Sequence, residues 1–110
     1  MSSPILVITT FPDLDTAQRM SREMVQEKLA ACVNIVAAGQ SIYIWKGEIC
    51  QETEHIAIIK TTDNCYQKIE NYIKEKHPYE LPEIISTPIT KGSKDYLAWL
   101  TNGLTTKTTS

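Results

Sequence analysis

The sequence predicts an α+β fold of the ferredoxin-like type, a βαββαβ order of strands and helices followed by a short C-terminal helix. Three observations support this order. Short β-rich apolar runs alternate with segments whose apolar residues recur at helical spacing. The dipeptide Lys46-Gly47 separates two long β-rich arms, which is a hairpin signal. A chain of 110 residues with 42% hydrophobic content can form one domain with its own core.

The first 30 or so residues predict a strand and a helix. Ile5–Ile8 is a continuous apolar run, typical of a buried strand. Asp13 or Asp15 is expected to cap the helix that follows, because a short acidic side chain accepts from free backbone N–H groups. The helical spacing continues to about Leu29.

The two arms of the predicted hairpin, Cys32–Trp45 and Glu48–Lys60, are long for a domain of this size. Each arm of roughly a dozen residues would extend about 40 Å. A compact domain of this length has a radius of gyration of about 13 Å. We therefore expect the hairpin to project, to bend, or both, with Gly39 as a plausible bend or bulge.

The second predicted helix begins at Thr62 or Asp63 and ends near His77. It stops there because Pro78 pushes the preceding residue out of the helical region. Polar and apolar residues along this segment divide into two faces, so one side is expected to pack on the sheet.

The rest of the chain predicts one more strand and one more helix. The strand is Glu83–Ser86, closed by Pro88, and the short helix is capped by Ser93 and ended by Gly103. We expect residues 1–104 to form a single ferredoxin-like domain and residues 105–110 to form a polar tail.

Two predicted strands carry apolar residues on both faces, although two helices can cover only one face of a sheet. The runs are ILVI, from Ile5, and HIAIIK, from His55. A strand with one wet face should alternate between apolar and polar residues. We expect other copies of the chain to bury the second face through the free edges of the hairpin. The alternative is a hairpin that folds back over its own sheet.

Composition excludes several classes of protein. A formal charge of -2 argues against nucleic-acid binding, which needs a basic stripe. No apolar run approaches the roughly 20 residues that cross a bilayer, and the N-terminus lacks the charged and apolar regions of a signal peptide. Three cysteines without C-x-x-C spacing suit a reducing cytoplasm.

Five segments in order resemble the CutA divalent-cation tolerance family: EKLAACVNI (27–35), YIWKGEI (43–49), IKTT (59–62), HPYELPEI (77–84) and DYLAWL (95–100). The resemblance covers about residues 4–104. It implies a ferredoxin-like subunit in a tight homotrimer whose hairpins pair between subunits. It also implies a cytoplasmic bacterial or organellar protein linked to copper and other divalent ions, in a family whose trimer is similar to PII-type signalling proteins.

The metal ligands that the resemblance implies transfer only in part. Copper-binding members place a cysteine near the end of the first strand and a histidine pair before Pro-Tyr. Here these positions hold Thr9 and the pair Lys76-His77. Hydroxyl and ammonium groups are poor copper ligands, because copper favours thiolate and imidazole.

The segment EKHPYELPEI, residues 75–84, is the candidate metal site. His77 with Glu83, or with Glu80, could hold copper or another divalent cation weakly. The alternative is purely structural: the prolines fix a turn, and a cationic His77 interacts with the helix dipole.

The three cysteines do not predict a designed site. Cys32 and Cys65 are expected to be buried as small apolar residues. Cys50 and His55 differ by an odd number and so point to opposite faces of a strand. Cys50 is expected to be the most exposed thiol.

We expect Trp45, Lys60 and Tyr79 to line a cleft between subunits. Trp45 near a hairpin tip would be exposed in a single copy and could pack on a neighbour. Lys60 could bind an anion there or simply extend its long stem to water.

Enzyme classes find no support. The loop after the first strand, TTFPDLDT, has no glycine and no arginine and so cannot cradle phosphate. No dinucleotide fingerprint is present, and we expect no organic cofactor. The first interpretation is therefore a non-catalytic, cytoplasmic homotrimer that responds to metal ions. The alternative is a PII-like signalling or scaffold trimer whose clefts bind a small anion or an unknown protein partner.

Overall fold

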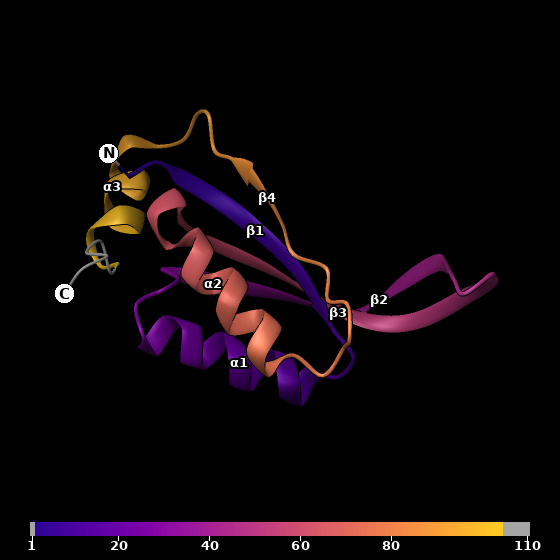
Figure 1. Ribbon diagram of the computed structural model, residues 1–110. Helices are drawn as coiled ribbons and strands as arrows, with labels where there is room; N and C mark the ends of the chain where they lie inside the picture. The colour runs from indigo at the N-terminus through magenta and orange to yellow at the C-terminus, as the bar shows by residue number, and fades with distance from the viewer. Residues whose placement is uncertain (1, 105–110) are drawn as a thin grey trace.

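The computed structural model describes residues 2–104, and the predicted tail at residues 105–110 lies outside them (Figure 1). The elements follow the predicted order: β1 (Pro4–Phe11), α1 (Leu14–Gln26), β2 (Cys32–Trp45), β3 (Glu48–Thr62), α2 (Asp63–Lys76), β4 (Ile85–Pro88) and α3 (Lys94–Asn102). The ferredoxin-like prediction is confirmed, whereas the domain limits stay a prediction.

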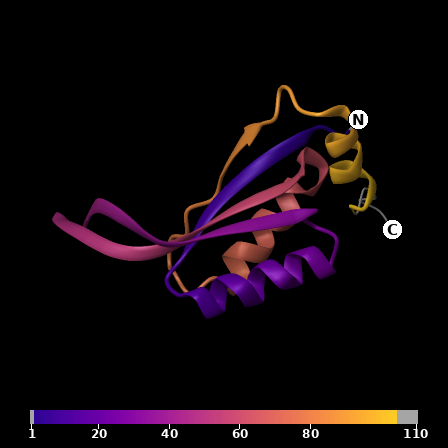
Figure 2. The same ribbon diagram turned by 180° about the vertical axis from the view of Figure 1, so that it is seen from behind.

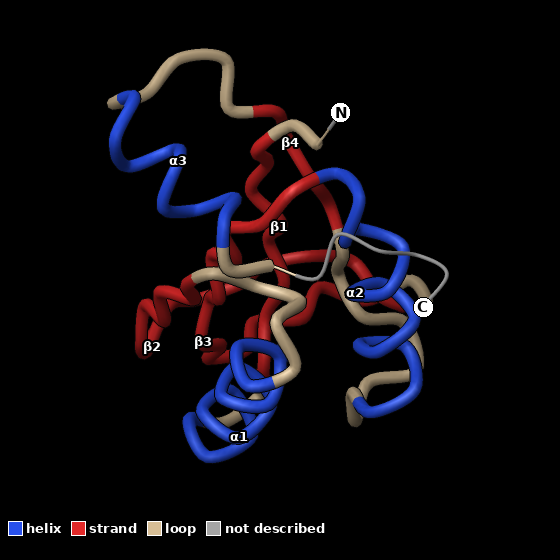
Figure 3. The backbone as a smooth tube through the Cα atoms, turned by 90° about the vertical axis from the view of Figure 1, so that its left-hand side faces the viewer, coloured by secondary structure: helices blue, strands red, loops and turns tan. Residues whose placement is uncertain are grey.

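The four strands form one antiparallel sheet in the order β2-β3-β1-β4. Figures 1 and 2 show α1 and α2 on the same face of this sheet. Figure 3 shows α3 on the other side of the strands from α1 and α2, and Figure 1 places it at the end of the sheet away from the hairpin tip. No helix within residues 2–104 is long and apolar enough to cross a membrane.

The face that α1 and α2 cover holds the core. Alternate residues of β1 point into it, from Val7 to Phe11, and they meet Ile59 from β3. The helices contribute apolar residues at helical spacing, among them Met24 of α1 and Ile73 of α2, all fully buried. Each such side chain contributes about 1.5–3 kcal/mol by leaving water.

Capping explains where α1 begins. The Asp13 carboxylate accepts a hydrogen bond from the Thr16 backbone N–H at 2.7 Å, as predicted for an N-cap. The helix stops at Gln26, earlier than the predicted Leu29, because Lys28 adopts a φ of 62° that a right-handed helix cannot include. Helical side-chain spacing alone does not reveal this change of backbone hand.

The hairpin projects beyond the helices, as expected (Figure 1). Lys46 and Gly47 both have positive φ, 53° and 83°, which fits a two-residue hairpin turn of the primed type. The register between β2 and β3 shifts between Val36 and Gly39, where Ala38 has a φ of 64°. The predicted bulge is thereby confirmed, and no fold-back of the hairpin over its own sheet occurs.

The position of β4 corrects the prediction. The strand is Ile85–Pro88 rather than Glu83–Ser86; it ends at Pro88 as predicted, and Pro88 itself pairs with Ile5. A proline is tolerated because β4 is an edge strand with a neighbour on one side only. Glu83 therefore belongs to the irregular segment before β4, which places it beside the hairpin.

The second face of the sheet, opposite α1 and α2, we call the open face. Cross-strand partners share a face, so the register places these apolar residues there: Leu6, Ile8, Val36, Ile56, Ile58 and Ile85. Val36 and Ile85 are about half exposed, at 49% and 54%. The expectation that two helices cover only one face of the sheet is confirmed for α1 and α2, and α3 reaches the open face at one end, where Tyr96 contacts Lys60.

Candidate functional site

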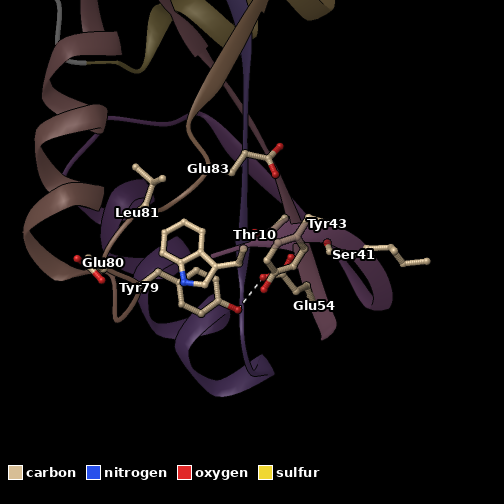
Figure 4. Close-up of a pocket in the computed structure, with 10 residues that line it drawn as sticks. Thr10, Ser41, Tyr43, Glu54, Tyr79, Glu80, Leu81 and Glu83 are labelled. Carbon is tan, nitrogen blue, oxygen red and sulfur yellow. Dashed lines mark hydrogen bonds between the residues drawn. The ribbon is translucent and has the colours of Figure 1, made fainter. Parts of the chain in front are cut away.

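A groove of about 630 Å³ lies where the hairpin meets the irregular segment between α2 and β4. Figure 4 shows its walls, with Tyr43 and Glu54 from the hairpin opposite Tyr79 and Leu81 from the segment. Thr10 of β1 forms part of its lining. Because Thr10 pairs with Ile56 across the ladder, this groove opens on the open face.

Three aromatic residues line the groove: Tyr43, Trp45 and Tyr79. Beyond the bulge, the odd residues of β2 share a face with Glu54, because Gly39 is the partner of Glu54 in the ladder. Tyr43 and Trp45 therefore turn toward the groove. Trp45 remains 40% exposed, and the Lys46 ammonium lies 5.9 Å from its ring centroid.

A buried carboxylate lies in the groove wall. Glu54 is only 6% exposed, and its Oε2 accepts a hydrogen bond of 2.6 Å from the Tyr79 hydroxyl (Figure 4). Burial, together with the Glu54 carboxylate, raises the pKa of Tyr79 far above its usual value. Tyr79 thus stays a protonated donor at physiological pH and holds the segment against the hairpin.

His77 anchors the same segment from the other side. Its Nδ1 accepts from the Tyr79 backbone N–H at 3.0 Å, and its Nε2 lies 2.6 Å from the carbonyl oxygen of Thr10. Since a carbonyl can only accept, Nε2 must carry the proton and donate. The ring also stacks on Phe11, with centroids 5.0 Å apart.

This environment corrects the expectation of a cationic His77. The side chain is buried, at 8% exposure, and burial lowers its pKa below the usual value. The imidazole is therefore neutral at pH 7 and contributes through hydrogen bonds rather than through the helix dipole.

The predicted metal ligands are not pre-assembled. Glu83 lines the groove, whereas both ring nitrogens of His77 already have partners. Among residues 2–104, no three His, Cys, Asp or Glu side chains come together as a metal cluster. Thr9 is buried in the core, and Lys76 is exposed on α2. The donor set does not fit a tight metal site.

The three residues predicted to line one cleft separate within a single copy. Trp45 and Tyr79 both line the groove of one copy, and the predicted cleft between subunits stays a prediction. Lys60 lies toward the other end of β3, where its Nζ is 3.3 Å from the Tyr96 hydroxyl and 5.5 Å from that ring centroid. The groove itself has no lysine or arginine and three glutamates, Glu54, Glu80 and Glu83, so it is not built for an anion.

The thiols divide as partly expected. Cys65 is fully buried, which confirms that prediction, but Cys32 is only half-buried, which contradicts the prediction for it. Cys32 lies opposite Lys60 on the open face rather than under the helices, since its neighbour Val33 takes the inward position. Cys50, the thiol expected to be exposed, is half-buried like Cys32, which corrects that prediction; all three thiols are free.

Two groove residues, Tyr43 and Glu54, were not among the predicted site residues. Alternation in the hairpin would have found Tyr43, which is two residues from Trp45 and so on the same face. Glu54 is harder to find, because its position relative to Trp45 depends on the bulge. No local pattern states whether β2 or β3 holds the extra residue.

Comparison with known families adds a match over nearly the whole domain. The family of the CutA1 divalent ion tolerance protein matches residues 5–103. A divalent-cation tolerance protein CutA from Thermus thermophilus is 41% identical over 95 residues, 86% of this chain and 92% of the relative.

Plant relatives show the same likeness. A chloroplastic protein CutA from Arabidopsis thaliana is 41% identical over 98 residues, or 89% of this chain; the matched region spans 54% of that longer protein. The crystal structure of CutA1 from Oryza sativa superposes with a TM-score of 0.93 at 36% identity, covering 96% of each chain. Fold and sequence therefore agree.

Proposed function

Because the chain belongs to the CutA1 divalent ion tolerance family, we propose that it acts in tolerance of divalent metal ions as a non-catalytic homotrimer. The family match over residues 5–103 is the observation that carries the metal part of this proposal. The family is named for tolerance rather than for a reaction, which supports the non-catalytic part.

The open face supports the homotrimer. It presents an apolar patch. The other side of the hairpin exposes a second apolar group, Ile42, Ile44 and Ile49, which are 67%, 71% and 78% exposed in one copy. Exposed apolar surface of this kind marks an interaction site. β2 is also a long edge strand with unpaired backbone groups along its outer side, ready to pair with another chain.

Weak direct binding of copper or another divalent cation completes the proposal. Glu83 is exposed at the groove and can supply an oxygen ligand. His77 can join it only by giving up its hydrogen bond to Tyr79 or to Thr10, which lowers the affinity. No organic cofactor is part of the proposed role.

A cytoplasmic location is the last part of the proposal. Three free thiols suit a reducing compartment. The Arabidopsis relative is named chloroplastic, so the compartment differs within the family and needs its own measurement by cell fractionation.

Light scattering and metal titration test the proposal. The expected mass is three times the 12.4 kDa of one chain, and a monomer at micromolar concentration contradicts the assembly. Calorimetry with copper and zinc is expected to show weak binding that Glu83→Gln reduces and the exposed helix variant Glu75→Gln leaves unchanged. If no heat is released at about 100 μM metal, the dissociation constant is weaker than that concentration, which corresponds to a binding free energy of about 5 kcal/mol. That result contradicts direct binding.

A further inference from the structure

The groove combines features that point to a ligand other than a metal ion. Aromatic faces from Tyr43, Trp45 and Tyr79 lie along its walls, and its charged residues are all acidic. Its volume of about 630 Å³ suits an organic molecule rather than a single ion. Within residues 2–104 no three donors converge as metal ligands require, so the negative charge is spread along the walls.

The buried carboxylate of Glu54 is the feature of the groove that most favours a cationic ligand. Its side chain is more than nine-tenths buried, and only its Oε2 is engaged, by the Tyr79 hydroxyl. In the described part of the chain, no lysine, arginine or histidine forms an ion pair with this carboxylate, and none lines the groove. Buried carboxylates are normally paired, because the loss of water around an unpaired charge is costly. Oε1 is not among the buried unpartnered polar atoms of residues 2–104, so we take it to be reachable from the groove, where it can accept from a ligand.

We propose that this groove binds a small organic cation, such as a primary diamine, whose ammonium group donates to Glu54 Oε1 while its carbon chain lies against the aromatic rings. An ammonium offsets the desolvation of Glu54 through a charge-assisted hydrogen bond. The faces of Trp45, Tyr43 and Tyr79 attract cations through their π electrons and also accept the methylene groups. Glu80 and Glu83, on the exposed part of the groove, suit a second ammonium group.

Within one copy, hydrogen bonds already hold the groove walls in place. Tyr79 is fixed twice, by its hydroxyl on Glu54 and by its backbone N–H on His77. The Glu54 carboxylate is thus oriented before the ligand binds, which reduces the entropy lost on binding. This inference goes beyond metal tolerance and does not depend on it.

Calorimetry on the assembled protein tests this proposal, with 1,4-diaminobutane as the probe and 1,4-butanediol as its neutral counterpart. We expect saturable binding of the diamine and none of the diol, at constant ionic strength near neutral pH. Glu54→Gln keeps the shape and the bond from Tyr79 but removes the charge, so it should weaken binding about tenfold or more. The matched control Glu75→Gln removes the same charge from the exposed face of α2 and should bind normally.

A second variant, Trp45→Leu, should weaken binding of the diamine severalfold without changing the melting temperature of the subunit. Absence of saturable binding up to about 10 mM diamine overturns the proposal, and so does equal binding by Glu54→Gln or by the diol. If Glu54→Gln instead dissociates the assembly and the diamine does not bind, the groove takes a basic residue of a second copy, and the proposal fails. Light scattering and copper titration of the same sample report separately on the metal-tolerance trimer.

Discussion

The two faces of the sheet are built from the same strands but are completed in different ways. On the helix-covered face, Val7, Phe11 and Ile59 meet α1 and α2 and lose all contact with water. On the open face, their immediate neighbours Leu6, Ile8 and Ile58 stay partly exposed, and α3 reaches this face at one end, where Tyr96 contacts Lys60. One face of the sheet is thus buried within a single copy, whereas the other face holds both the groove and the apolar surface that another copy can cover.

The largest effect should come from the helix-covered face. Ile59→Ala removes a fully buried side chain and leaves a cavity, which should lower the free energy of unfolding by about 2–5 kcal/mol. Denaturant unfolding at several protein concentrations measures it. The matched variant Ile58→Ala, one residue away on the open face, should lose stability in a way that depends on protein concentration, because assembly contributes to it. The same concentration dependence for both variants would erase the distinction between the faces.

The hairpin should show the next largest effect. Ile44→Lys places a charge in the most exposed apolar part of the molecule, where burial against another copy is worth about 1.5–3 kcal/mol per side chain. We expect light scattering to report a smaller mass, while the far-ultraviolet circular dichroism of the subunit is retained. Lys68→Ala on α2 serves as a surface control. An unchanged mass for Ile44→Lys would remove this part of the hairpin from the interface.

His77 should give a smaller, pH-dependent effect. Its pKa in the folded state lies below the unfolded value of 6.5, so the unfolded chain binds more protons as the pH falls below 6.5. The stability that neutral His77 provides is therefore full above pH 6.5 and decreases toward pH 5, by at most about 1.4 kcal/mol per pH unit. Urea unfolding at a series of pH values measures this slope.

The control for that slope is His77→Gln, which cannot titrate. The difference in the free energy of unfolding between the wild-type protein and His77→Gln should be larger above pH 6 and smaller at lower pH. Asp13, whose pKa the backbone N–H of Thr16 lowers, acts in a separate window below about pH 4. If the free energies of unfolding of the two proteins change in parallel between pH 5 and 7, then folding does not change the pKa of His77.

The helix cap should give the smallest effect. Asp13→Ala removes the acceptor for the Thr16 N–H at the start of α1 and should lower the melting temperature slightly, because the cap is exposed to solvent. Asp15→Ala, in the first turn of the same helix, removes a charge but no cap. Thermal unfolding should separate the two variants, and equal losses would mean that charge rather than capping sets the contribution of Asp13.

Local chemistry explains what the sequence could predict of the fold. The Lys46-Gly47 turn, the Asp13 cap and the bend near Gly39 each depend on a few adjacent residues, and each is confirmed. The end of α1 at Gln26 and the position of β4 were predicted wrongly. The first depends on the positive φ of Lys28, and the second depends on which residues of β1 remain free to pair.

The groove was only partly predictable, because it forms between distant segments. Trp45 and Tyr79 were expected to share a cleft between subunits; both line the groove of one copy, and the cleft between subunits stays a prediction. Glu54 was missed, since it reaches Tyr79 across 25 positions of the chain. The tautomer of His77 likewise depends on Thr10, which is 67 positions away.

The bulge at Ala38 has one more consequence, for the phase of the hairpin. Before it, the even residues of β2, such as Val36, lie on the open face; after it, the odd residues Tyr43 and Trp45 do. Without that one-residue offset the aromatic rings would swap sides with Ile42 and Ile44, and an aliphatic wall would stand beside Glu54. The ligand proposed for the groove thus depends on the one-residue bulge in β2, which decides which side chains of the hairpin face Glu54.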